Sequence, residues 1–169
     1  MKEADRKKRN TDRLLHLHAP FRVRIERIIK VLEEGGLRPR IQDGWRSPEA
    51  QLAAYNGGYS KLKFGFHNCV SKTGDPEGLA VDMLDDDAPL APRRPYLLRL
   101  AAAAEAEGLQ TGIRWGVPAA LRSAIDQAIA TGDWDAVVKI GWDPTHVEPV
   151  GITPRQAQKK ISAGQHALS

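Results

Sequence analysis

Residues 142–148 read Trp-Asp-Pro-Thr-His-Val-Glu (WDPTHVE), which places a histidine, two carboxylates and a proline within seven positions. Asp143 precedes His146 by three residues, and Glu148 follows it by two. Pro144 pushes Asp143 toward an extended backbone, so this spacing does not predict a helical turn. The motif therefore differs from the helical H-E-x-x-H metal sites and has to act from a strand end or a loop. Alone it fits two interpretations, a turn that holds charged residues or half of a metal site.

The composition indicates one soluble globular domain. The chain has 169 residues, of which 41% are hydrophobic and 27% are charged, and both fractions are ordinary for such a domain. The single Cys69 excludes an internal disulfide and a Cys-rich zinc cluster. Of the net charge of +4, residues 1–13 contribute +3. We expect a basic flexible tail over 1–13 and a single domain over 14–169. A weak attraction to a polyanion stays open, but we expect no nucleic-acid partner.

The N-terminal region shows no pattern of a secretory signal. Its basic start is followed by LLHLHAPFRVRIERII, which lacks the uninterrupted apolar run of such a signal. No segment approaches the ~20 apolar residues that a membrane-spanning helix needs. We therefore expect a soluble chain made in the cytoplasm, without a membrane partner.

Hydrophobic spacing predicts a mixture of helices and short strands. Apolar residues at 21, 25, 28, 29 and 32 form a helical stripe that ends at Gly35 and Gly36. Ser47 and Thr153 stand where helix N-caps are expected. The predicted helices are 21–34, 47–58, 94–108, 117–132 and one from Thr153 onward, and the predicted strands are 38–45, 78–84, 109–116 and 134–142. This order favours an α+β fold, a small and mostly antiparallel sheet with helices packed on it.

Two residues in the middle of the chain can complete a metal site. His67 opens a polar stretch that ends at Asp82, and Asp82 interrupts an otherwise apolar strand. Burying a carboxylate there is costly unless it is paired or binds a metal, although Asp82 could instead face solvent on a half-buried strand. Together with His146 these residues make two imidazoles and one carboxylate, a catalytic zinc set that leaves one position for water. We expect the three other histidines to face solvent: His16, His18 and His166.

Further residues fit hydrolytic chemistry at such a site. Asp143 could act as general base toward the water. Arg46, in GWRSPEAQ, could stabilise an oxyanion or pair with a substrate carboxylate, and its alternative is a surface ion pair. Glu148 could hydrogen-bond a ligand histidine or line the substrate groove, and its alternative is a solvated turn.

In four ordered blocks the chain resembles the zinc D,D-peptidase family (peptidase M15), which has the Hedgehog/D,D-peptidase fold. The blocks are GWRSPEAQ, His67 followed by GLAVD ending at Asp82, RWG with Trp115, and DPTH with Asp143 and His146. The resemblance implies the zinc ligands His67, Asp82 and His146. It also implies that Asp143 is the general base and that Arg46 stabilises the transition state. We expect Gln51, Trp115 and Glu148 to bind substrate.

The resemblance implies a zinc metallopeptidase that cleaves peptidoglycan stem peptides as a D,D-carboxypeptidase or an L-Ala-D-Glu-type endopeptidase. We expect a monomer that reaches the cell wall after release or export, as an endolysin-like phage or prophage enzyme or a secreted effector. The chain departs from the family pattern in an insertion at 68–77, in Gly65 where a serine is usual, and in a helix-length segment at 118–131.

Three alternatives remain open from the sequence. Two histidines and a carboxylate also form the facial triad of non-haem Fe(II) oxygenases, although that class uses a barrel with many strands. The fold could serve as a non-catalytic module that binds the wall or a protein. Finally, the candidate residues could lie apart in space.

Overall fold

The computed structural model describes residues 1–168, and its strands form one antiparallel sheet in the order β1-β2-β4-β3. The strands are β1 (Pro39–Asp43), β2 (Val81–Asp85), β3 (Leu109–Gly112) and β4 (Asp143–Pro149). Helices and strands alternate along the chain without the regular βαβ repeat of parallel sheets. The architecture confirms the expected α+β class with a small antiparallel sheet.

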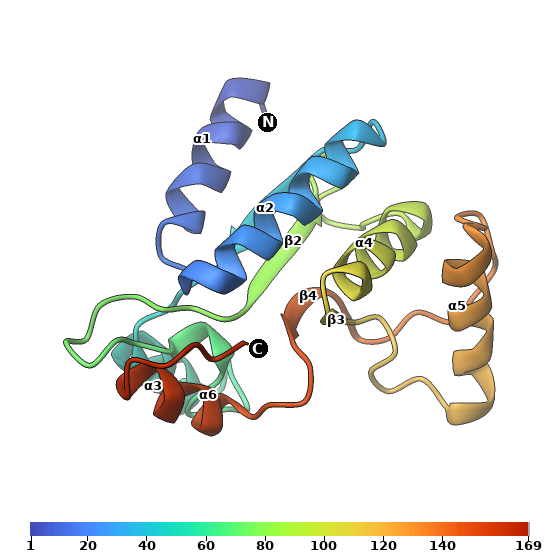
Figure 1. The fold of residues 1–169 in the computed structure, drawn as a ribbon. Coiled ribbons are helices and arrows are strands. Elements are labelled where there is room, and N and C mark those ends of the chain that lie inside the picture. Colours follow the sequence, from blue (N-terminus) through green and yellow to red (C-terminus); the bar gives the residue numbers. More distant parts are fainter. Residues whose placement is uncertain (169) are drawn as a thin grey trace.

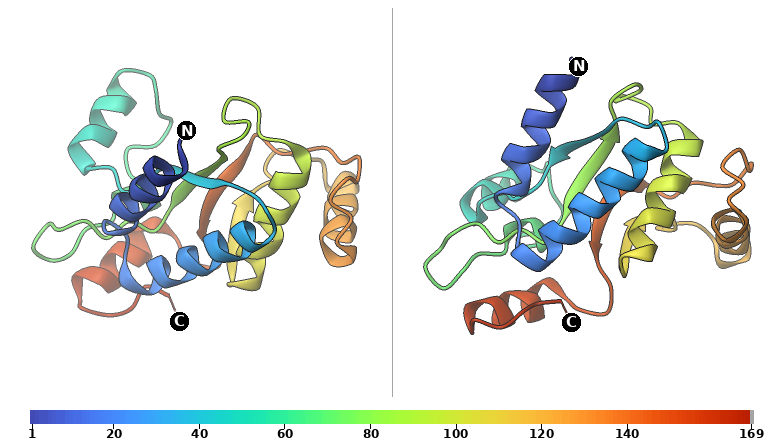
Figure 2. Two further views of the ribbon diagram at one scale, coloured as in Figure 1. Left: turned by 90° about the horizontal axis from the view of Figure 1, so that it is seen from above. Right: turned by 45° about the horizontal axis from the view of Figure 1, so that its top comes forward.

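Six α-helices surround this sheet within the described residues: α1 (Glu3–Leu14), α2 (Ala19–Glu34), α3 (Pro48–Asn56), α4 (Arg94–Ala106), α5 (Ala119–Thr131) and α6 (Pro154–Ser162). In Figure 1, α2 and α4 lie across one face of the sheet, and α5 stands beyond α4. Figure 2 shows α3 on the other side of the sheet from α2. None of the helices in residues 1–168 combines the length and the apolar character needed to cross a membrane.

The core lies between the sheet and the layer of α2 and α4. Val81 and Met83 of β2 are fully buried, and they belong to one core cluster with buried side chains such as Ile25 of α2 and Leu98 of α4. Because side chains alternate along a strand, the residue between Val81 and Met83 points to the opposite face. That residue is Asp82, so the alternation turns its carboxylate away from the core.

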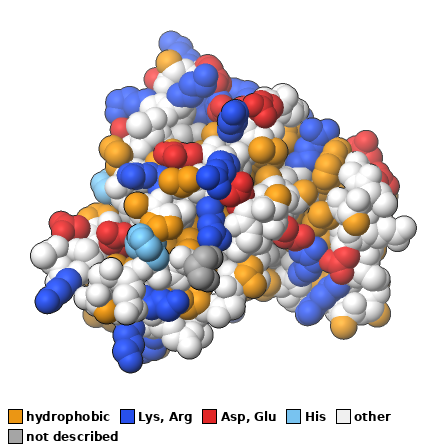
Figure 3. Space-filling view, in the orientation of Figure 1, with side chains coloured by type: hydrophobic (Ala, Val, Ile, Leu, Met, Phe, Trp, Pro, Cys, Tyr) orange, Lys and Arg blue, Asp and Glu red, His pale blue; other side chains and the backbone are white. Residues whose placement is uncertain are grey.

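Residues 1–13 form most of helix α1, in place of the expected flexible tail. Arg6 is buried, and its guanidinium donates to the backbone oxygen of Pro39 at 2.6 Å and pairs with Glu3 and Glu33. The sequence pattern missed this because a basic run without an apolar stripe resembles a solvated segment. Figure 3 shows basic and acidic side chains interspersed over this part of the surface, in line with these ion pairs.

Helix α1 also covers the outer edge of β1. Asn10 is buried, and its amide bridges the strand: it donates to Pro39 O at 3.0 Å and accepts from Ile41 N at 2.8 Å. Arg9 donates to the backbone oxygens of Ile41 and Gln42. Side chains of α1 therefore satisfy the backbone groups that an edge strand leaves unpaired.

The C-terminal strand differs from its prediction. Residues 134–142 form turns and irregular backbone, and β4 begins only at Asp143. The apolar run suggested a strand, but in the structure several of its side chains pack against the core from a loop. Pro144 lies inside β4 although it has no N–H to donate. A register irregularity opposite, between Thr111 and Gly112 of β3, accommodates this part of the strand.

The insertion at 68–77 is tied to both ends of the chain. The side chain of Gln158 on α6 accepts from Val70 N and donates to Val70 O. His18 was expected to face solvent, but it is only 7% exposed, and its Nδ1 lies 2.6 Å from a carboxylate oxygen of Glu77. The sequence could not indicate this contact, because the two residues lie 59 positions apart.

Candidate metal centre

The sheet register brings two of the predicted ligands together. Asp82 on β2 is the direct cross-strand partner of His146 on β4, so their side chains stand next to each other on the face away from the core. His67 reaches the same place from a short 3₁₀ helix, η1 (Phe66–Asn68). One ligand atom from each of the three residues lies within 4.8 Å of the others. The alternative that these residues lie apart in space is therefore wrong.

Each histidine has one ring nitrogen fixed outward and the other turned toward Asp82. Nδ1 of His67 hydrogen-bonds the backbone oxygen of Gly44, and its Nε2 lies 3.7 Å from Asp82 Oδ2. Nε2 of His146 lies 3.1 Å from Glu148 Oε2, while its Nδ1 is 3.0 Å from Asp82 Oδ1. Outer acceptors of this kind orient metal-binding imidazoles and fix their tautomer.

The donor set and its spacing fit a zinc ion. Ligand atoms of a tetrahedral zinc site with bonds of about 2.0–2.1 Å stand roughly 3.3 Å apart. The two histidine-to-Asp82 separations of 3.0 and 3.7 Å lie on either side of this value. Two imidazole nitrogens and a carboxylate also match the three-ligand sets of catalytic zinc sites. The residues present can thus hold a divalent metal.

The charges of the three residues are strongly linked. Burial lowers the pKa of His67, and the neighbouring His146 adds to this effect. Burial also acts to lower the pKa of His146, but hydrogen bonds with Asp82 and Glu148 outweigh it and raise that pKa to about 9. The pKa of Asp82 is lowered, because its contacts with the two histidines outweigh its burial. Asp82 is therefore a carboxylate that needs a cation beside it, a place that the His146 imidazolium or a metal can fill.

Asp143 lies at the first position of β4, opposite Gly112 of β3. Its carboxyl group is half-buried, and burial raises its pKa. The imidazole of His146 acts in the other direction, while the nearby carboxylates of Asp82 and Glu148 raise the pKa further. An acid in such surroundings is more basic than an exposed aspartate, which suits a group that accepts a proton.

Arg46 is held in place by residues of its own segment. Its guanidinium pairs with Asp43 at 2.5 Å and donates to Gln51 Oε1 at 3.0 Å. Its backbone N–H donates to His67 O at 2.9 Å, which joins the Arg46 segment to η1. The positive charge of Arg46 contributes to the lowered pKa of Asp82, so it favours the ionised form of this carboxylate.

The three residues expected to bind substrate differ in their distance from the metal cluster and in their contacts. Gln51 is buried, and its amide donates to Ser60 Oγ and Leu62 O; its contacts hold Arg46 and the following loop. Trp115 lies beside the cluster, with its ring centroid 5.4 Å from that of His146. Glu148 spans His146 and the amide of Gln110, which donates to Glu148 Oε1 at 3.0 Å.

Sequence reasoning missed several residues around the cluster: Asp43, Gly44, Gln110 and Trp142. Gly44 opens the quoted block GWRSPEAQ and Asp43 stands directly before it, so both lie within three residues of Arg46 in the sequence. Gln110 can be found only through the β3–β4 register, which pairs it with Glu148.

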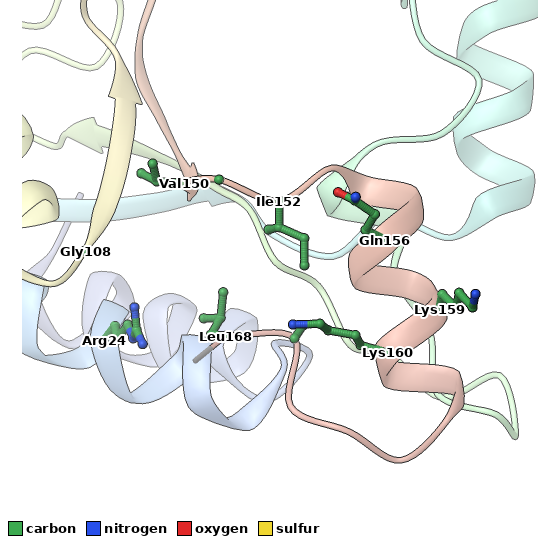
Figure 4. Close-up of a pocket in the computed structure, with 10 residues that line it drawn as sticks. Arg24, Gly108, Val150, Ile152, Gln156, Lys159, Lys160 and Leu168 are labelled. Atoms are coloured by element: carbon green, nitrogen blue, oxygen red, sulfur yellow. The ribbon is translucent and has the colours of Figure 1, made fainter.

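A cavity of about 400 Å³ lies between α2, the end of β4 and α6. Figure 4 shows Lys160 and Leu168 beside it, with Val150 and Ile152 along its upper side. Its lining includes none of His67, Asp82 or His146. The metal cluster lies instead on the sheet face turned away from α2 and α4, so we assign the chemistry to that face.

No family model matches the chain, and no curated protein matches it. Among solved structures, the crystal structure of Serratia marcescens L-Ala D-Glu endopeptidase ChiX matches with a TM-score of 0.51 and 16% sequence identity, over 84% of this chain and 86% of that chain. The chain has the fold of this endopeptidase. That finding confirms the D,D-peptidase-like fold expected from the sequence, and at this identity the likeness concerns the fold alone.

A second solved structure matches more loosely. It is a mutant of the vancomycin resistance D,D-pentapeptidase VanY from the VanB-type resistance cassette, in complex with Zn(II). The match covers 87% of this chain and 79% of the VanY chain, with 19% sequence identity and a TM-score of 0.39. The match is too loose to support an argument about this chain.

Proposed function

We propose that the chain is a zinc-dependent metallopeptidase that hydrolyses amide bonds of peptidoglycan stem peptides. The observation that carries this proposal is the convergence of His67, Asp82 and His146, with inner nitrogens facing Asp82 and outer nitrogens fixed by acceptors. The shared fold with an L-Ala D-Glu endopeptidase supports the choice of a peptide of the cell wall as substrate.

Each residue has a role that its position supports. When bound, zinc supplies Lewis-acid activation of a water molecule and of the scissile carbonyl. Asp143 accepts the proton released by the water and delivers it to the leaving amine, helped by its raised pKa. Arg46 faces the charge that develops on the carbonyl oxygen, with its guanidinium kept in place by Asp43 and Gln51.

Two further candidate functions receive less support. The single four-stranded antiparallel sheet does not resemble the many-stranded barrel expected of Fe(II) oxygenases. A non-catalytic wall-binding module would need neither a general base nor a nearby cation, yet the charges of Asp143 and Arg46 both interact with residues of the cluster.

Digestion of purified peptidoglycan by the zinc-loaded protein tests the proposal. Soluble products are identified by mass spectrometry, with Asp143→Ala as the inactive variant and Asp135→Ala, an exposed aspartate of the preceding loop, as its matched control. We expect Asp143→Ala to retain zinc and lose about 10²-fold or more in rate, while Asp135→Ala keeps the wild-type rate.

The products also identify the bond that is cut. Release of terminal alanine indicates a carboxypeptidase, and release of peptides from cross-links or from the glycan-linked stem indicates an endopeptidase. Absence of any product from the zinc-loaded wild type would contradict a wall peptidase. Binding to the wall without cleavage would then favour the module.

A further inference from the structure

A continuous row of aromatic rings leads from the metal cluster to the surface. The centroids of the His67 and His146 rings are 5.1 Å apart, and Trp115 follows at 5.4 Å from His146. Trp142 comes next, with its ring centroid 5.3 Å from that of Trp115. Trp142 is 72% exposed. The row therefore begins at the ligands and ends at a large apolar side chain in solvent.

The position of Trp142 is fixed by the loop that follows β3. Its backbone N–H donates to Trp115 O at 3.1 Å. A side chain on Gly116 would bring a Cβ to 3.1 Å from Trp142 Cδ1, and Gly116 has a φ of +73°, which L residues rarely adopt. Both features let the indole of Trp142 lie close against this loop beside Trp115.

Burial does not account for a tryptophan at this position. With 72% of its surface exposed, Trp142 removes little apolar area from water, so it gains little from the fold. Single exposed hydrophobic side chains are common and need no explanation by themselves. Here the exposed ring is in contact with Trp115, and Trp115 is in contact with a ligand histidine.

We propose that Trp142 and Trp115 form a binding subsite for the peptide chain of the substrate, on one side of the scissile bond. This inference rests on the proposed function. Indole faces bind flat amide groups and small alkyl side chains, with a large contact area and few rotatable bonds to fix. Trp142 is then a specificity residue that contacts substrate away from the reacting atoms.

The spacing of the rings sets the length of peptide that reaches Trp142. An extended peptide advances about 3.3–3.6 Å per residue, and the row takes two steps of 5.4 and 5.3 Å from His146 to Trp142. Because the two steps added end to end give the longest possible span, a substrate needs at most roughly three residues beyond the scissile bond to contact Trp142. A dipeptide, with one residue on that side of the bond, reaches only Trp115.

The test measures how binding depends on peptide length. Zinc-loaded protein carrying Asp143→Ala, to prevent turnover, is titrated calorimetrically with stem peptides of two to five residues. The comparison is made with and without Trp142→Ala. Val137→Ala is the matched control, because Val137 is an exposed apolar residue of the same connection. Trp142→Phe tests rescue by another aromatic ring.

We expect Trp142→Ala to weaken binding of the longest peptides about 3- to 10-fold, the range that corresponds to one aromatic contact. Dipeptides should bind with unchanged affinity, Val137→Ala should have no effect at any length, and Trp142→Phe should recover most of the loss. In the enzyme that retains Asp143, Trp142→Ala should raise KM for long substrates with little change in kcat.

Other outcomes overturn the inference. Equal weakening at every length would indicate a structural role, and no weakening would remove the subsite. Weakening that appears only in a parallel titration with a stem peptide attached to glycan would assign Trp142 to a sugar ring instead. Wild-type hydrolysis together with any of these results rejects the subsite alone. Failure of the zinc-loaded wild type to cleave or bind any stem peptide rejects the proposed function as well.

Discussion

Glu148 and Gly44 show how much of a metal site depends on residues that do not touch the metal. Each accepts from the outer nitrogen of a histidine, and each comes from a strand or strand end of the sheet. Glu148 is itself held by Gln110 on the neighbouring strand. Rotation of either imidazole would break one of these bonds, so the inner nitrogens stay turned toward Asp82 before a metal arrives.

We predict that Glu148→Gln weakens zinc binding about 10-fold, the lower end of the range for residues that hydrogen-bond a metal ligand. The substitution keeps the shape but removes the negative charge that favours a ligated imidazole. Competition with a chromophoric zinc chelator measures the affinity. Glu26→Gln, at an exposed site on α2, is the control. An unchanged affinity in Glu148→Gln would show that His146 does not need this acceptor.

Helix α1 is rich in charged residues, yet its side chains cover the edge of the sheet. Its buried Asn10 and Arg6 and its Arg9 hydrogen-bond the backbone of β1, where another sheet would place a further strand. Strand β1 leads directly to Asp43 and Gly44, which hold Arg46 and His67. Helix α1 therefore supports the site through β1 although it lies outside it.

We predict that Asn10→Ala lowers the free energy of unfolding by about 1–3 kcal/mol, because it leaves the buried Ile41 N–H without its acceptor. Urea denaturation followed by circular dichroism measures the change. Thr11→Ala, one position along on the exposed side of α1, should cost far less. If both variants lose the same stability, the bridge to β1 does not contribute as argued.

The elements also show which sequence signals are reliable. Ser47 and Thr153 cap α3 and α6 with side-chain bonds to Ala50 N and Gln156 N, as their local patterns indicated. Both motifs are complete within four residues, so no tertiary contact is needed to recognise them. The run at 134–142 has no such local marker, and its apolar residues fit a loop against the core as well as a strand.

The same distinction applies to the candidate site. The three metal-binding candidates could be selected from sequence because a buried carboxylate in a strand and histidines beside turns are unusual. The buried position of His18, the ordered α1 and the Gln110–Glu148 pair could not, since each depends on contacts between distant segments. Trp142 escaped notice because its exposure is visible only in three dimensions.

For the whole molecule, metal binding should act as a stabilising ligand. At a free zinc concentration of about 100 times Kd the gain is about 2.7 kcal/mol. For a chain of 169 residues this corresponds to a rise in Tm of roughly 5–10 °C. Differential scanning calorimetry with and without zinc measures it. His146→Ala should abolish the rise, whereas His166→Ala, an exposed histidine outside the cluster, should keep it.

If His146→Ala shows the same rise as the wild type, zinc binds elsewhere and the candidate centre is wrong. Removal of the metal with a chelator should return the wild type to the lower Tm. The apo protein should remain folded, because the core between the sheet and helices α2 and α4 does not include the cluster.

The pairing of Asp82 with His146 joins positions 64 residues apart, across two strands that are not consecutive in the chain. In the unfolded chain, closing such a loop is entropically costly, and contacts of this range form late on the way to the native state. We therefore expect the metal site to form only when assembly of the sheet is nearly finished. Bound zinc should therefore lower the unfolding rate and leave the folding rate unchanged.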